Sequence, residues 1–369
     1  MICLFRIVMT VALLFVNANA YAGSVSDVVT STTVESPQQP QAAVGSDGTI
    51  YVAFGSGDTI YCSRSADGGV TYQSPVRIGR LPGLALGRRR GPRIVVASGK
   101  VVVTAISHES GNLFAWNSSD HGRHWSGPLR VNDSAKDCRE GLHAMAASSE
   151  GHVYCAWLDL RSGSTEIYGS HSADGGASWT ANRRVYRSPS GTVCECCHPA
   201  VTYDADGRLS VMWRNSVAGA RDMFVAGSMD HGRSFGPARK LGQETWPLNA
   251  CPMDGGYLAS ADAGQLTTVW RRKDTVYRTD GPDHSEVRLG VGLQPWAAAT
   301  GRGTWIVWLE RRNGSLMYTA PDRKQPQRLT DAANDPVIAG PVQGPGPVVV
   351  VWESGEANHR LIRSQVLQP

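Results

Sequence analysis

Seven short apolar runs recur along the chain, and each begins at a glycine. In five of them an aromatic residue stands six places after the glycine. The run at residues 99–105 has the same length but ends in alanine, and the run at residues 301–308 is one residue longer. The runs are residues 48–54, 99–105, 151–157, 207–213, 264–270, 301–308 and 346–352. Each has the length of a strand, is generally rich in valine and is bounded by Gly, Ser or Asp. This pattern predicts buried β-strands.

A second pattern, Ser-x-Asp-x-Gly-x-x-aromatic, follows each of the first four runs. Its copies are residues 65–72, 118–125, 172–179 and 228–235. The Asp can bond backbone amides of its own turn, the Gly allows a positive φ and the aromatic packs beneath the sheet, so each copy predicts a hairpin tip. The motif resembles the Asp box of the sialidase superfamily. In that family the boxes lie at the periphery, away from the substrate, which implies a structural role here.

Together the repeats divide the chain into units that each supply one four-stranded sheet. Sheets of this kind arranged in a ring form an all-β propeller, and we expect seven blades in a single domain over residues 21–369. The expected blades are residues 41–80, 90–131, 142–187, 198–241, 254–290, 294–329 and 335–367. Six blades with an extra closing segment is the alternative, because sialidases have six. Residues 25–33, rich in Thr and Val, are expected to add the strand that closes the ring.

The first twenty residues have the features of a cleaved leader. A positive residue, Arg6, precedes an apolar run of ten over residues 7–16, and Ala18-Asn19-Ala20 fits a signal-peptidase site. The run is too short to span a bilayer, and no later segment is long and apolar enough. We therefore expect a secreted or periplasmic protein without a membrane span. The formal net charge of +4 is too small and too spread to indicate nucleic-acid binding, and we expect a monomer.

Seven cysteines remain after the leader, and most stand on loops that enter the innermost strands. The densest cluster, at residues 194–198, reads Cys-Glu-Cys-Cys-His. Cys155 is different, because it stands inside a predicted strand and is expected to be a buried core thiol. In an exported protein disulfide bonds are the first interpretation, and the odd number leaves at least one thiol unpaired.

Two other interpretations of the cluster remain open. A soft-metal site would take its ligands from Cys194, Cys196, Cys197, His198, Cys251 and Met253, which suit copper(I), or zinc without the Met. Covalent haem c is the third, because Cys194, Cys197 and His198 satisfy the C-x-x-C-H pattern, with His198 as the axial ligand.

The resemblance to sialidases also implies a catalytic set on the loops at the channel mouth. Sialidases hold the substrate carboxylate with three arginines, use a Tyr–Glu pair as nucleophile and an Asp as acid and base. Here the arginine candidates are Arg93, Arg271 and Arg312, with Glu310 as the partner acid and Asp159 as the acid/base. The nucleophilic Tyr is not assigned. The Phe/Tyr-Arg-Ile-Pro motif of the family is represented only by an Arg-Ile pair at residues 93–94.

The leading hypothesis is therefore a secreted or periplasmic, sialidase-like glycoside hydrolase. It would bind a glycan or another small anionic ligand at the channel mouth and would need no cofactor. The alternative is a non-hydrolytic propeller that binds copper, zinc or haem c through its Cys, His and Met loops. A scaffold that binds a protein or glycan across one face is a third class, for which the sequence offers nothing specific.

Overall fold

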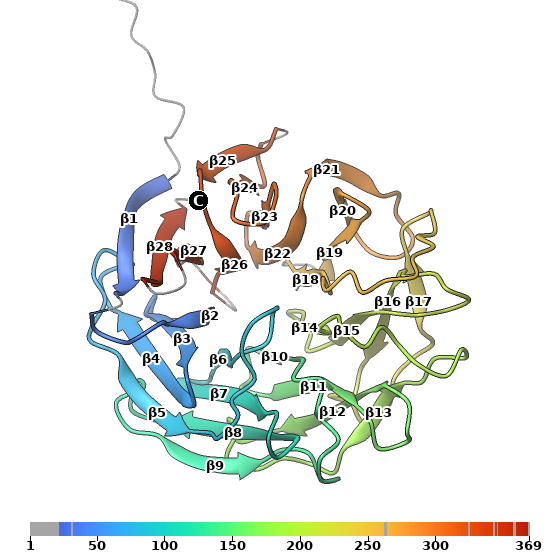
Figure 1. Ribbon diagram of the computed structural model, residues 1–369, viewed down its shortest axis with the longest axis horizontal. Coiled ribbons are helices and arrows are strands. Elements are labelled where there is room, and N and C mark those ends of the chain that lie inside the picture. Colours follow the sequence, from blue (N-terminus) through green and yellow to red (C-terminus); the bar gives the residue numbers. More distant parts are fainter. Residues whose placement is uncertain are drawn as a thin grey trace, which may run out of the picture.

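Seven four-stranded antiparallel sheets form a closed ring in the computed structural model, as Figure 1 shows. The structure describes residues 22–30, 32–261, 264–323, 325–341, 344, 346–356 and 359–367. The expected leader at residues 1–20 lies outside the described residues. The seven-bladed all-β propeller predicted from the repeats is confirmed, in preference to the six-bladed alternative. No helix in the described part of the chain has the length and hydropathy needed to cross a membrane.

The innermost strand of each blade faces the central axis. These strands are β2 (Gln38–Val44), β6 (Arg93–Ala97), β10 (His143–Ala147), β14 (Ala200–Tyr203), β18 (Tyr257–Ser260), β22 (Leu293–Thr300) and β26 (Asn334–Ala339). The second strands are β3 (Ile50–Ser56), β7 (Lys100–Ser107), β11 (Val153–Asp159), β15 (Leu209–Arg214), β19 (Leu266–Arg272), β23 (Gly303–Leu309) and β27 (Val348–Ser354). All seven glycine-led apolar runs are therefore second strands, and their aromatic side chains are buried in the core.

Each blade continues outward with a third and a fourth strand. The third strands are β4 (Thr59–Ser65), β8 (Asn112–Ser118), β12 (Glu166–Ser172), β16 (Met223–Ser228), β20 (Thr275–Thr279), β24 (Leu316–Thr319) and β28 (Leu361–Leu367). The fourth strands are β5 (Val76–Arg80), β9 (Ser126–Arg130), β13 (Arg183–Tyr186), β17 (Arg239–Leu241), β21 (Val287–Val291), β25 (Gln327–Thr330) and, in blade 7, β1 (Ala22–Val29). We number the blades 1 to 7 from β2 to β26.

The N-terminal strand closes the ring. Strand β1 pairs antiparallel with β28, so blade 7 contains strands from both ends of the described chain (Figure 1). This confirms the closing role expected for residues 25–33, although the strand itself begins earlier, at Ala22, and ends at Val29. Val28 and Val29 are buried in the hydrophobic core that includes blades 6, 7 and 1. Pairing covers the outer edge of β28, which would otherwise present free backbone groups.

The four Asp boxes form the turns between third and fourth strands. In the first, Asp67 Oδ1 accepts hydrogen bonds from the Ser65 hydroxyl at 2.7 Å and from the Thr71 amide at 3.0 Å. The amide of Gly69 donates to the Ser65 hydroxyl at 2.9 Å. The other three boxes repeat the hydrogen bond from Ser to Asp and the hydrogen bond from Gly to Ser. The boxes are therefore built as the motif predicts, at the end of the ring opposite the loops that enter the innermost strands.

Candidate functional site

A cleft of about 680 Å³ opens between blades 7 and 1, on the loops that enter the innermost strands. It lies on the face where the sequence places the functional groups. Its polar lining comes from four loops far apart in the chain and includes Gln39, Asn313, Asp335, Glu353, Glu356 and Arg360. Beyond these loops, the inner strands of all seven blades line an axial channel that is rich in alanine and valine. The cleft therefore gathers polar side chains from loops that are far apart in the chain.

The innermost strands beside the cleft begin with an unusual local structure. Gln39, Gln294 and Asp335 each precede a proline, and each has a left-handed φ, of 55°, 55° and 44°. The pairing register of each innermost strand shifts at the same point, as in a β-bulge. Bulges redirect side chains near functional sites, and here the three polar side chains meet near the axis. The sequence signal is a polar residue followed by proline at the start of an innermost strand.

Two carboxylates in the cleft share one amide group. The Gln39 side-chain nitrogen Nε2 donates to Asp335 Oδ2 at 2.6 Å and to Glu353 Oε1 at 3.4 Å. The backbone amide of Gln39 also donates to Glu353 Oε1, at 2.7 Å. On the other side, Gln294 Nε2 donates to Asp335 Oδ1 at 2.9 Å. The two acids of blade 7 are therefore held in place by Gln39 of blade 1 and Gln294 of blade 6.

Burial changes the acidity of Glu353. Its side chain is about 6% exposed, and Arg360 Nε lies 3.7 Å from its Oε2. Burial, and next the neighbouring carboxylate of Asp335, raise the pKa of Glu353 to about 7. A carboxyl group with this pKa can hold a proton at neutral pH and release it to a reacting oxygen.

A buried arginine lies beside the two carboxylates. Arg89, from the loop before β6, donates to the carbonyl oxygens of Pro336 and Gln294, both at 2.8 Å. Its Nε lies 4.0 Å from Asp335 Oδ1, and its guanidinium lies over the ring of Trp296, 5.0 Å from the centroid. Burial lowers the pKa of Arg89. The residue joins blade 2 to blades 6 and 7 and places positive charge next to Asp335.

Two of the residues assigned from the sialidase resemblance are buried in local contacts. Arg93 donates to the carbonyl oxygens of Gly91 and Arg89 at 3.2 and 2.6 Å, so its guanidinium supports the loop that carries Arg89. Asp159 is fully buried at the end of β11. It accepts from the Trp157 indole at 2.8 Å and from Arg161 Nε at 2.8 Å.

Of the other three assigned residues, Arg271 lies near the end of second strand β19, and Glu310 and Arg312 lie on the loop after second strand β23. Arg271 Nε donates to the Lys273 carbonyl at 2.6 Å. Glu310 and Arg312 are exposed on the loop between β23 and β24, and Asn313 of that loop lines the cleft. The five residues thus come from blades 2, 3, 5 and 6, and only this last loop reaches the cleft between blades 7 and 1. The sequence reasoning did not select Gln39, Asp335 or Glu353 as site residues.

The three cysteines of the Cys-Glu-Cys-Cys-His loop are gathered into one cluster. Their Sγ atoms lie 3.4 Å apart for Cys194 and Cys197, 3.7 Å for Cys194 and Cys196, and 4.0 Å for Cys196 and Cys197. Burial is the main cause that raises the pKa of the Cys197 thiol, to about 12. All seven cysteines of the described residues are free thiols, so the structure does not show the disulfides that export suggested. Cys155 is a buried core thiol, as expected.

The remaining metal candidates are placed apart from the three sulfur atoms or on their margin. His198 is buried, its Nδ1 lies 3.0 Å from the Pro199 carbonyl, and its ring lies 5.6 Å from that of Trp296. Burial lowers the pKa of His198 to about 3. Cys251 is exposed, and Met253 is partly buried. The haem alternative needs Cys194 and Cys197 open to a porphyrin, whereas both thiols are buried.

Comparisons with known proteins agree with the Asp boxes and the ring. Residues 88–250 match the BNR repeat-like domain family. A xyloglucanase from a Paenibacillus species is 32% identical over 167 residues, which cover 42% of this chain and 16% of that protein. The matched segment therefore spans about a sixth of the length of this relative.

Solved structures show the same fold at low sequence identity. An α-L-arabinanase from Penicillium chrysogenum, complexed with arabinobiose, is 13% identical with a TM-score of 0.55, over 93% of this chain and 98% of that chain. The Hadza microbial sialidase Hz136 is 12% identical with a TM-score of 0.51, over 86% of this chain and 76% of that chain. The chain thus forms a seven-bladed β-propeller with four Asp boxes, and its residues 88–250 are similar to the BNR repeat-like domain family.

Proposed function

We propose that this protein hydrolyses glycosidic bonds in a glycan and that the cleft between blades 7 and 1 is its active site. The observation that carries the proposal is the carboxylate pair, Asp335 and Glu353, bridged by Gln39 Nε2 in a cleft of about 680 Å³. Most glycosidases use two carboxyl groups on either side of the scissile bond. The similarity to a xyloglucanase over part of the chain supports the same class of substrate.

The two acids take different roles because their surroundings differ. Glu353 holds a proton at neutral pH and donates it to the leaving glycosidic oxygen. Asp335 accepts hydrogen bonds from Gln39 and Gln294 and lies near Arg89, which suits a carboxylate that acts at the anomeric carbon or on the attacking water. The proton from Glu353 completes the leaving group, and water supplies the hydroxyl of the product sugar. The remaining proton of that water passes to Asp335 if Asp335 acts on the water, or back to Glu353 if Asp335 acts at the anomeric carbon.

Exo-sialidase activity is the finer form of the proposal. It would require an arginine clamp for the sialic acid carboxylate, with Arg271 and Arg312 as outer members and Arg93, Glu310 and Asp159 in the roles the resemblance assigns. The buried contacts of Arg93 and Asp159 favour a neutral glycan over this assignment. A sialoside therefore belongs in the substrate panel beside xyloglucan and arabinan oligosaccharides.

The test is a substrate panel with matched variants. Glu353→Gln and Asp335→Asn should each lower turnover by about 100-fold or more, because each removes a proton-transfer or charged group from the reaction. Glu109→Gln, an exposed acid on the same face of blade 2, should leave turnover unchanged. Asp159→Asn and Arg312→Ala test the residues of the sialidase resemblance. Folded protein without turnover on any glycan, or full turnover in both cleft variants, would refute the proposal.

A second candidate function is metal binding by Cys194, Cys196 and Cys197. Two thiolates on one tetrahedral zinc ion lie about 3.8 Å apart, given a Zn–S distance of about 2.3 Å. The three Sγ separations of 3.4 to 4.0 Å bracket this value. Copper(I) is the other ion that such soft ligands suit. Metal analysis of the purified protein and of a Cys196→Ser variant tests it, and an equal, metal-free result in both would exclude the site.

We also propose that the protein is exported from the cytoplasm. A glycan-cleaving protein with the leader-like residues 1–20 is expected to act outside the cytoplasm. N-terminal sequencing of protein recovered from the medium or periplasm should begin at Tyr21, and a chain that retains Met1 in the cytoplasm would contradict it.

A further inference from the structure

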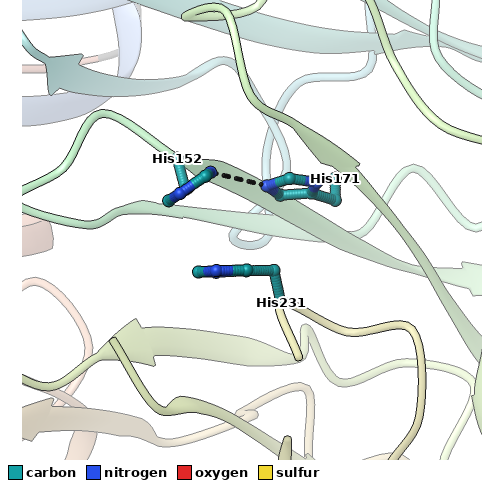
Figure 2. A group of neighbouring side chains, drawn as sticks. All are labelled: His152, His171 and His231. Atoms are coloured by element: carbon teal, nitrogen blue, oxygen red, sulfur yellow. Dashed lines mark hydrogen bonds between the residues drawn. The ribbon is translucent and has the colours of Figure 1, made fainter. Parts of the chain in front are cut away.

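Three histidines gather where blade 3 meets blade 4, at the end of the ring opposite the cleft. His152 stands in the turn before β11, His171 lies on β12, and His231 belongs to the Asp box of blade 4. One ring nitrogen from each lies within 4.8 Å of the corresponding nitrogens of the other two. Figure 2 shows the hydrogen bond between His152 and His171 as a dashed line, with the ring of His231 beside the two. We propose that these three imidazoles form a binding site for a divalent transition-metal ion, with zinc as the first candidate.

The spacing of the rings agrees with a shared ion. His171 Nε2 and His152 Nδ1 lie 3.0 Å apart. Two imidazole nitrogens on one tetrahedral zinc ion lie about 3.3 Å apart, because the Zn–N distance is about 2.0–2.1 Å. The rings of His152 and His231 are in contact, with centroids 4.0 Å apart, so the third imidazole lies against the pair.

An unsatisfied nitrogen provides a second observation. Nδ1 of His231 is buried and has no hydrogen-bond partner. A buried polar atom without a partner costs free energy, and an ion between the rings would satisfy it. His231 has a φ of 56°, in the left-handed region that glycine adopts most readily. In the Asp boxes of blades 1 and 3, glycine occupies the same position.

The corresponding junction of blades 1 and 2 provides an internal comparison. His121 occupies the position of His231 in its Asp box, and its Nδ1 lies 3.1 Å from the Tyr51 hydroxyl. The strand register there places Arg64 opposite Tyr51, as it places His171 opposite Tyr154 in blade 3. A histidine in the Asp box is therefore accommodated by ordinary hydrogen bonding at one junction. At the other junction the neighbouring side chains are also histidines.

The surroundings favour a cation with an open coordination position. Glu150 Oε2 lies 3.7 Å from His152 Nε2, so a carboxylate stands next to the outer nitrogen of one ligand, as second-shell carboxylates do in zinc sites. His152 and His231 are half-buried, which leaves one side of the cluster open to water. Imidazole ligands suit zinc, copper(II) and nickel(II), and availability decides among them.

The experiment measures zinc binding by the full chain after treatment with EDTA, using inductively coupled plasma analysis and titration calorimetry. Wild type should bind one equivalent of zinc at the three histidines. In His231→Asn and in His171→Ala, the affinity for this equivalent should be at least about 100-fold lower. Asn is chosen at 231 because it tolerates the left-handed backbone. Thermal unfolding in EDTA should show both variants folded. His121→Ala, at the matched position of blade 2, should keep this equivalent.

Cobalt(II) separates this site from the cysteine cluster. Cobalt bound by the three histidines gives no thiolate-to-metal absorption band, whereas cobalt bound by Cys194, Cys196 and Cys197 does. The proposal predicts that wild type binds one equivalent of cobalt that gives no thiolate-to-metal band. His231→Asn should no longer bind this equivalent. Equal stoichiometry and affinity in wild type and both histidine variants, or loss of the same equivalent in His121→Ala, would overturn it.

Discussion

Asp335 and Glu353 accept hydrogen bonds from the same nitrogen, Nε2 of Gln39, at 2.6 and 3.4 Å. The two acids belong to blade 7, whereas Gln39 begins blade 1, so the contact exists only in the closed ring. The contact with Gln39 holds Glu353, whose pKa is raised by burial, beside the carboxylate of Asp335. The closure between blades 7 and 1 is therefore part of the proposed active site.

The raised pKa of Glu353 predicts the pH dependence of turnover. Burial and Asp335 raise it to about 7, so the protonated acid predominates below pH 7 and is lost as the pH rises through this value. We expect kcat/KM to decline above about pH 7 on the best substrate of the panel. In Glu353→Gln this alkaline limb should disappear together with most of the activity. An unchanged alkaline limb in the residual activity of the variant would contradict the assignment.

Removal of the buried guanidinium of Arg89 should destabilise the ring. Arg89→Met deletes two hydrogen bonds to carbonyl oxygens and leaves Asp335 without its nearby positive charge. We expect a loss of about 3 kcal/mol or more in the free energy of unfolding, measured with urea. Arg88→Met is the matched control, because Arg88 is exposed and has a similar left-handed φ. That control should change stability by about 0.5 kcal/mol or less. Equal effects of the two substitutions would show that Arg89 is not a structural link.

Loss of the closing strand should open the ring. A chain that begins at Thr30 lacks β1 and exposes the edge of β28, together with apolar surface that Val28 and Val29 cover. We expect a lower Tm and concentration-dependent association, measured by calorimetry and by light scattering. Asp27→Ala tests the exposed ion pair with Arg363 alone, and its effect should be about 1 kcal/mol or less. A truncated chain that stays monomeric with an unchanged Tm would contradict the closing role.

The first Asp box should affect stability but not turnover. Hydrogen bonds from the Thr71 hydroxyl and amide, and from Ser65, hold the pKa of Asp67 below its ordinary value of 3.8. A lowered carboxyl pKa stabilises the fold above the ordinary value, and this contribution is lost as the pH falls through the folded-state pKa. Asp67→Ala should therefore lower the Tm at pH 7, and the difference from wild type should shrink as the pH falls below about 4. A loss of turnover at an unchanged Tm would instead indicate a catalytic role for the box.

The sequence alone was sufficient for the fold because its repeats rest on local chemistry. The glycine-led apolar runs became the second strands, and the four Asp boxes became the turns between third and fourth strands. Hydrophobic period, turn glycines and the short reach from Ser65 to Asp67 all act within a few residues, so a single chain displays them directly. The repeat count then fixed seven blades, and the Val- and Thr-rich segment near the N-terminus indicated the closing strand.

The sites were decided by tertiary structure, because their members are far apart in the chain. Gln39 meets Glu353 only after the ring has closed, and His231 meets His152 only where two blades pack together. Local patterns indicated Asp159 and Arg93 as candidate residues but did not reveal their contacts. Asp159 is buried against Arg161, and Arg93 donates to the carbonyl oxygen of Arg89. The physical reason is that strand and turn preferences are local free energies. Proximity, burial and the resulting pKa shifts depend on neighbours that the whole propeller supplies.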